Sequence, residues 1–196
     1  MKHCHGSTPA NRARIRTSNR TGIRGVTLIE MIMVIAIVAI LAAVAVPSFA
    51  AIRQNAAKRT ALNNFWHAIF LARSEAMKRN SVIGICKSND GQNCNNARGD
   101  WAGGWIVFDN LNHDEPAERD IDEPILQVYP AWPTGRITSN RQTFTFRPIT
   151  QGAVNGTIVF CDASGHGAQA IIISHTGRPR QSSRDASNKP LQCSTS

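Results

Sequence analysis

The chain has 196 residues, 42% of them hydrophobic, and a formal net charge of +9. This size suits one ordinary domain plus a targeting segment, and it is long enough to bury a hydrophobic core. Residues 1–25 carry six basic residues and no acid, which leaves 16 basic (22 − 6) against 13 acidic residues afterwards. The rest of the chain therefore has a net charge near +3, so the high positive charge of the chain comes mostly from residues 1–25.

Apolar residues fill the segment Val26–Ala51, which only Thr27, Glu30 and Ser48 interrupt. As a helix, this segment spans about 39 Å at about 1.5 Å per residue, more than a hydrocarbon core of about 30 Å. A cleaved secretory signal is the alternative, but its apolar region is shorter and ends at small residues of the Ala-x-Ala kind. The basic residues before the segment are expected to stay cytoplasmic, which sends the C-terminal domain across the membrane.

The helical pattern continues beyond the apolar segment. Apolar residues recur there at spacings of three and four, which is typical of an amphipathic helix: Leu62, Phe65, Ile69, Ala72 and Ala76. Basic residues occupy other faces: Arg53, Lys58, Arg59, Arg73 and Lys78. The pattern predicts one helix from about Val26 to Arg79, with its second half packed on the globular domain.

Short β-type runs separated by turn residues follow Asn80. The expected strands are Ser81–Cys86, Trp105–Phe108, Ile125–Tyr129, Thr143–Arg147, Thr157–Cys161 and Ala170–Ser174. Strict alternation in Thr143–Arg147 predicts that its two phenylalanines face the core. Residues 109–124 are expected to form an acidic loop, with seven acids and one arginine between Asp109 and Glu123, and residues 175–196 a polar tail.

Four of the five cysteines follow the apolar segment, and Cys4 precedes it. An even number downstream of a membrane segment favours disulfides in an oxidising compartment. Zinc is the alternative, but neither Cys-x-x-Cys nor paired His spacing supports it. Four cysteines allow three pairings, of which we favour Cys86–Cys94, closing a short loop, and Cys161–Cys193, tying the tail to a strand.

The junction Arg24-Gly25-Val26-Thr27-Leu28-Ile29-Glu30 resembles the processing site of type IV prepilins and pseudopilins. The resemblance implies cleavage after Gly25 by prepilin peptidase and N-methylation of Val26. It also implies that Glu30 meets the terminal amine of a neighbouring subunit during assembly. A carboxylate in an apolar membrane segment is costly and needs a partner or a function. An exposed glutamate favoured by the helix dipole is the alternative for Glu30.

Three further segments resemble the FimT/GspH group of minor pilins and pseudopilins: Trp101–Phe108, Thr157–Cys161, and Ala170–Ser174 with the following Thr176–Arg180. The resemblance implies an α+β fold in which a long N-terminal helix, membrane-embedded in its first half, packs on antiparallel β-sheets. The expected organisation is a cleaved leader (1–25), a transmembrane and assembly half-helix (26–51), an amphipathic half-helix (52–80) and a β-rich domain with a basic tail (81–196).

Basic residues gather after the last expected strand, in Gly177-Arg178-Pro179-Arg180 followed by Arg184 and Lys189. Pro179 favours an extended path, in which alternate side chains share a face about 6–7 Å apart. The arginine fork suits phosphate, and the resemblance to FimT-type proteins implies DNA binding during natural transformation. A solvated turn, or arginines paired with the acidic loop, is the alternative.

The predicted function is therefore a FimT-like minor pilin that captures extracellular double-stranded DNA without sequence preference. The alternative is a structural or priming minor pilin, or a type II secretion pseudopilin. Prepilin peptidase, other pilins and the inner membrane are the further expected partners, with the globular domain in the periplasm or in the pilus. No nucleophile or acid–base constellation indicates an enzyme, and no cofactor or metal is expected.

Overall fold

The computed structural model describes residues 25–95, 100–148, 152–162, 167–185, 187–191 and 193, except for the side chains of residues 47 and 48. The predicted leader lies outside the described residues apart from Gly25. The chain divides into two compact units, residues 1–44 and residues 45–196.

A single helix of 52 residues, α1, runs from Leu28 to Arg79, two residues shorter at its start than predicted. Thr27 caps it: the Thr27 hydroxyl accepts the N–H of Glu30 at 3.3 Å, and the Thr27 carbonyl accepts the N–H of Met31 at 3.2 Å. The described side chains of the first unit are exposed and almost all apolar. Judged by length and composition, α1 is able to cross a membrane.

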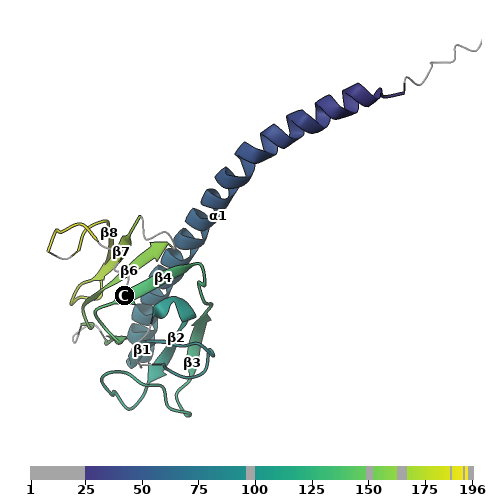
Figure 1. The fold of residues 1–196 in the computed structure, drawn as a ribbon. Helices are drawn as coiled ribbons and strands as arrows, with labels where there is room; N and C mark the ends of the chain where they lie inside the picture. Colours follow the sequence, from purple (N-terminus) through teal and green to yellow (C-terminus); the bar gives the residue numbers. More distant parts are fainter. Residues whose placement is uncertain are drawn as a thin grey trace, which may run out of the picture. The chain divides into compact units, whose positions relative to one another are not determined.

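Two four-stranded antiparallel sheets follow the helix in the second unit (Figure 1). The first has the strand order β3-β2-β1-β5, and the second has the order β4-β6-β7-β8. Their bounds are β1 Val82–Lys87, β2 Trp105–Asn110, β3 Ile125–Tyr129, β4 Gly135–Ser139, β5 Thr143–Phe146, β6 Gly156–Asp162, β7 Gln169–Ile173 and β8 Pro179–Ser182. A short 3₁₀ helix, Trp101–Gly103, precedes β2.

One hydrophobic core joins the second half of α1 to both sheets. The predicted stripe is confirmed, since its five apolar residues are all buried against strands of both sheets. Phe65 is fully buried, and its ring makes edge contacts with the rings of Trp101, Trp105, Phe144 and Phe160 at centroid distances of 5.3–6.1 Å. The large aromatic side chains therefore build the core.

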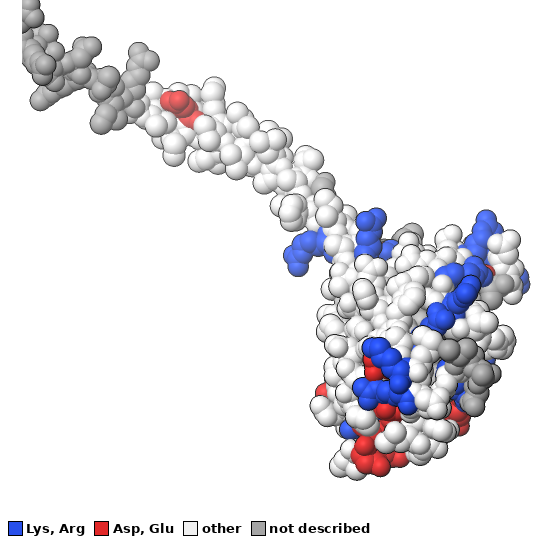
Figure 2. Space-filling view, turned by 180° about the vertical axis from the view of Figure 1, so that it is seen from behind, with Lys and Arg blue, Asp and Glu red and all other residues white. Residues whose placement is uncertain are grey.

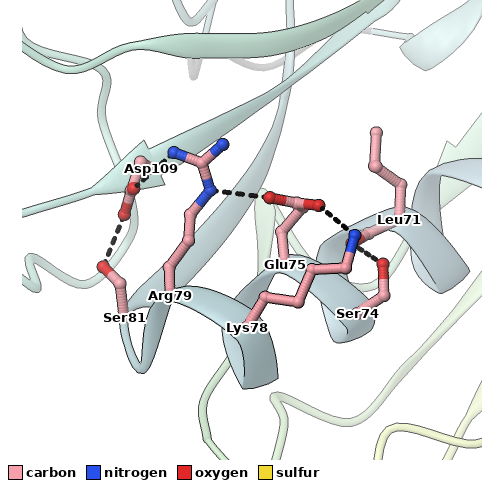
Figure 3. Close-up of polar contacts among 7 residues, drawn as sticks. All are labelled: Leu71, Ser74, Glu75, Lys78, Arg79, Ser81 and Asp109. Carbon is pink, nitrogen blue, oxygen red and sulfur yellow. Dashed lines mark hydrogen bonds and ion pairs between the residues drawn. The ribbon is translucent and has the colours of Figure 1, made fainter.

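A chain of charged groups fastens the end of α1 to β2 (Figure 3). Arg79 bonds Glu75 at 2.6 Å and approaches Asp109 at 3.6 Å, while Ser81 donates to Asp109 at 2.5 Å. Hydrogen bonds from Arg79 and Lys78 lower the pKa of Glu75 below its ordinary value. The helix ends at Arg79, and the next residue, Asn80, has a φ of 52°, in the left-handed region common after helices.

Two strands were missed by the pattern analysis, and both are edge strands. β4 has one buried apolar residue, Ile137, and β8 (Pro-Arg-Gln-Ser) has none, so neither shows the alternation that indicates a strand. Each is formed by pairing, β4 with β6 and β8 with β7. The polar tail predicted for residues 175–196 therefore contains a strand.

The acidic loop is more closely packed than expected. Thr143 and Thr145 are as buried as the phenylalanines of β5, because the loop covers that face of the first sheet. The N–H of Ala117 donates to the Thr143 hydroxyl at 3.2 Å, and the Thr145 hydroxyl donates to Glu115 at 3.1 Å. The prediction that the two phenylalanines of β5 face the core is confirmed, and the acidic loop buries the opposite face of β5 as well.

Both favoured disulfides are present, joining Cys86 to Cys94 and Cys161 to Cys193. The first closes the loop after β1. The second carries the chain end to β6, whose partner strand β7 leads into β8. Cys193 is thereby covalently held to the sheet that also contains β8.

Candidate functional site

The start of α1 presents three of the predicted site residues at the surface. Gly25, Val26 and Glu30 are exposed. A methyl group placed on Gly25 would meet no atom within 4 Å, so packing does not require glycine there. Glu30 stands three residues after the cap Thr27, which is the spacing of a capping box. Thr-x-x-Glu before an apolar run is the usual sequence signature of this cap, and it could have located the start of the helix.

The arginine motif forms the turn and first residues of the β7–β8 hairpin. Arg180 pairs with Ile172 in the register between the two strands. Ile171 and Ile173 belong to the core, so Ile172 and Arg180 lie on the opposite face of the sheet. Arg178 precedes Arg180 by two residues, in the turn directly before β8. Both arginines are exposed, as predicted.

The turn before the strand is held by Ser174. Its carbonyl accepts the N–H of Gly177 at 2.8 Å, and its hydroxyl accepts the N–H of Arg178 at 3.2 Å. Gly177 has a φ of 72°, a conformation that side chains disfavour. Pro179 opens β8 at the edge of the sheet, where a missing N–H is tolerated. The motif therefore supplies the turn residues as well as the charges.

The other two predicted basic residues lie in a separate small turn of the tail. The guanidinium of Arg184 donates to the carbonyl of Asn188 at 3.0 Å. The carboxylate of Asp185 accepts the N–H of Ser187 at 2.8 Å and the N–H of Lys189 at 2.9 Å. Both basic side chains are exposed. The structure thus places Arg178 in the turn before β8, Arg180 on β8, and Arg184 and Lys189 in the next turn.

The acidic loop does not neutralise the motif. In the described part of the chain, the guanidinium groups of Arg178 and Arg180 form no hydrogen bond or ion pair. The acids of residues 109–123 pair instead with Arg79 and Arg147. Another carboxylate is engaged within the loop itself, since the buried Glu123 accepts hydrogen bonds from the N–H groups of residues 111, 112 and 120.

Charge is unevenly distributed over the second unit. Figure 2 is turned by 180° from Figure 1, so β7 and β8, which lie on the left in Figure 1, lie on the right in Figure 2. A row of Lys and Arg side chains runs along that right side, and a second basic group lies nearer the centre of the same face. Asp and Glu gather at the lower end of this view. Such segregation concentrates positive potential beside the β8 edge.

A groove of about 620 Å³ lies beside the motif, between α1 and the β7–β8 turn. Three arginines line it, each from a different element: Arg73 from α1, Arg147 after β5, and Arg178 from the turn. Met77 and Phe146 provide apolar surface in the same groove. Arg147 is bonded to Glu115, whereas Arg73 has no hydrogen-bond or ion-pair partner among the residues described.

Two residues that the helical pattern assigned to solvent have tertiary contacts. Lys58 is only 8% exposed; its Nζ donates to the carbonyl of Gly167 at 2.9 Å and lies 3.4 Å from Asp162. Arg73 is half-buried against the turn at Gly177. Both partners lie about a hundred residues away along the chain, so no local pattern indicates them.

The described residues offer neither a free Cys161 nucleophile nor a metal site. The sulfur of Cys161 is bonded to Cys193, so it is not a free nucleophile in this state. Within the described ranges, no group of three His, Cys, Asp or Glu side chains is arranged to hold a metal ion.

Comparisons with known proteins give one match at the start of the helix and another over its second half and most of the β-rich domain. The family described as type II transport protein GspH matches residues 61–177, more than half of the chain. The prokaryotic N-terminal methylation motif matches residues 20–46. No curated protein matches. Two crystal structures of the type IV minor pilin FimU from Pseudomonas aeruginosa are similar, with 21% and 22% identity and TM-scores of 0.49 and 0.48; the matches cover 72% and 71% of this chain and 96% and 99% of theirs.

Proposed function

This chain belongs to the GspH family of pilin-like proteins, and from that premise we propose that it is a minor type IV pilin whose β8 edge captures double-stranded DNA. The pilin or pseudopilin function follows from the family and from the methylation motif at its start. Capture of DNA is the finer proposal, and it is supported by the exposed Arg178 and Arg180, whose guanidinium groups have no partner among the described residues.

Processing after Gly25 is part of the proposal. Because a methyl group on Gly25 would meet no neighbour, the fold gives no packing reason for a glycine at this position. Recognition by prepilin peptidase supplies a reason, and the methylation motif covers the same junction. The new terminus would be Val26, with Glu30 four residues beyond it for contact with a neighbouring subunit. The exposed apolar start of α1 would anchor the protein in the inner membrane before assembly.

The DNA proposal rests on Arg178 and Arg180, two exposed arginines two residues apart at the start of β8. Arginine contacts phosphate through two parallel N–H donors, and two arginines this close along the chain suit neighbouring phosphates of a duplex backbone. Neither guanidinium has to leave a protein partner before it binds, within the described part of the chain. Phosphate contacts carry no base information, so we expect binding without sequence preference.

The second candidate is a purely structural pilin or pseudopilin that primes or caps a fibre. The exposed apolar residues of the first unit, together with Glu30, support it, since they suit helix packing in an assembly. The two candidates share the anchor and the processing site. They differ in what the arginines of β8 do.

Fluorescence anisotropy distinguishes the two candidate functions. A labelled DNA duplex is titrated with the full chain in nonionic detergent, at salt concentrations between about 50 and 200 mM. Three phosphate contacts, from Arg178, Arg180 and Arg184, give a log–log salt slope of roughly −3. Replacing Arg178 and Arg180 with Gln should flatten the slope by about two and weaken binding to all duplexes alike. The matched control replaces two exposed arginines of α1, Arg53 and Arg59, and should leave the slope unchanged.

Absence of binding by the folded wild-type chain at about 50 mM salt would remove the DNA proposal and leave fibre priming as the better account. An equal effect of the control pair would show that overall charge, rather than the β8 face, controls binding. Circular dichroism of each variant establishes that the fold is retained.

A further inference from the structure

We propose that Arg73 of α1 is an additional phosphate-contacting residue, and that Arg73 and Arg178, which line one groove, contact neighbouring phosphates of the bound duplex. This inference rests on the proposed DNA binding and extends its site from the edge strand onto the helix. The sequence pattern assigned Arg73 only to a polar face of α1.

The groove is formed by elements from distant parts of the chain. The helix contributes Arg73 and Met77, the end of β5 contributes Phe146, and the β7–β8 turn contributes Gly177 and Arg178. All of these residues lie in the second compact unit. Arg178 lines the groove and directly precedes β8, so the groove adjoins the strand that carries Arg180.

Gly177 sets the closeness of the helix and the turn. A methyl group at this position would lie 3.4 Å from both Cδ and Nε of Arg73, and 3.2 Å from Cβ of Ala153. The guanidinium of Arg73 therefore lies against the backbone that directly precedes Arg178. The glycine of the motif serves two purposes: it permits the positive φ, and it leaves room for Arg73.

The charges of the groove suit an anion. Its lining contains three arginines and no Asp or Glu. Glu115 compensates Arg147 from outside the lining, which leaves Arg73 and Arg178 as two cations of one groove without an ion-pair partner among the described residues. Like charges in a partly enclosed site repel, and phosphates bound by the two guanidinium groups relieve that repulsion.

Partial burial prepares Arg73 for this contact. Its side chain is half-buried between the turn and the helix surface, whereas Arg178 and Arg180 are exposed. A side chain already confined by packing loses less rotamer freedom when it binds. We therefore expect Arg73 to contribute as much to affinity as either exposed arginine.

Replacing Arg73 with Gln in the full, detergent-solubilised chain tests the assignment. With Arg73 as a fourth contact, the wild-type slope should be about −3.6, and Arg73→Gln should flatten it by about 0.9. If the two chains bind equally at 1 M salt, affinity should fall about fifteenfold at 50 mM and about fourfold at 200 mM. Lys78→Gln, which removes an exposed charge from another face of the same helix, should leave the slope unchanged.

Because Arg73 packs on the turn, a purely structural effect on Arg178 has to be separated from a lost contact. Arg73→Lys keeps the charge and should restore the slope, although not the full affinity, since lysine lacks the planar fork. The Arg73→Gln/Arg178→Gln pair should flatten the slope by about 1.8 if each residue contacts its own phosphate.

A wild-type slope in Arg73→Gln, with a flattened slope in the Arg178 and Arg180 variants, would overturn this inference and leave the β8 site standing. A slope in Arg73→Lys as flat as in Arg73→Gln would also overturn it, because charge at this position would then be irrelevant. Failure of the wild-type chain to bind would overturn both proposals together.

Discussion

Replacing Phe65 with Ala measures how strongly the aromatic core joins α1 to the two sheets. The Phe65 ring is fully buried and makes edge contacts with four other rings, two of them tryptophans. Removing a buried phenylalanine costs about 3–5 kcal/mol, from lost burial and the remaining cavity. Each aromatic pair adds about 0.5–1.5 kcal/mol beyond the buried area, so we expect a loss near the upper end, about 4–5 kcal/mol.

Phe70 provides a matched control five residues further along the helix. Its side chain is 46% exposed and has one ring contact, with Trp66 at 5.7 Å. The same chemical change at this position removes little buried area, and we expect Phe70→Ala to cost about 1 kcal/mol or less. The comparison separates burial in the core from the loss of a phenylalanine in a helix.

Urea unfolding of a fragment starting at Arg53, followed by tryptophan fluorescence, measures both changes. The core, both sheets and both disulfides lie downstream of Arg53. With a denaturant slope of about 2 kcal/mol per molar urea, the midpoint should fall by about 2 M for Phe65→Ala and by less than about 0.5 M for Phe70→Ala. Equal shifts, or a loss below about 1.5 kcal/mol at Phe65, would refute the central role assigned to this ring.

Three further predictions concern other parts of the chain. Intact mass of the membrane-extracted protein should show loss of residues 1–25 and a methyl group on Val26, and Gly25→Val should leave the precursor uncut. Replacing Cys161 and Cys193 with Ser should lower stability by about 3–4 kcal/mol in urea, since the bridge spans 32 residues. Because the pKa of Glu75 is lowered in the folded state, its contribution is present at neutral pH and lost as pH falls; thermal melts between pH 5 and pH 3 should therefore decline less steeply for Glu75→Gln than for wild type.

Features with a local signature could be predicted from the sequence. The five-residue stripe of α1 was found because a helix repeats every 3.6 residues, and the Cys86–Cys94 bridge because its loop is short. Edge strands without apolar residues, such as β8, gave no such signal, since hydrogen bonding to β7 forms them. Arg73 was likewise assigned to a polar face, because its contact with the turn at Gly177 exists only in the folded chain.

The exposed edge of β8 has a consequence for how the protein behaves in concentrated solution. An edge strand presents unpaired backbone N–H and C=O groups that can recruit a strand from another molecule. Proline at the start of β8 and the two positively charged side chains beside it oppose such pairing, through a missing donor and through mutual repulsion between copies. The residues proposed to attract a polyanion thus also keep identical molecules apart, and neutralising Arg178 and Arg180 would weaken the protection of the edge against self-association.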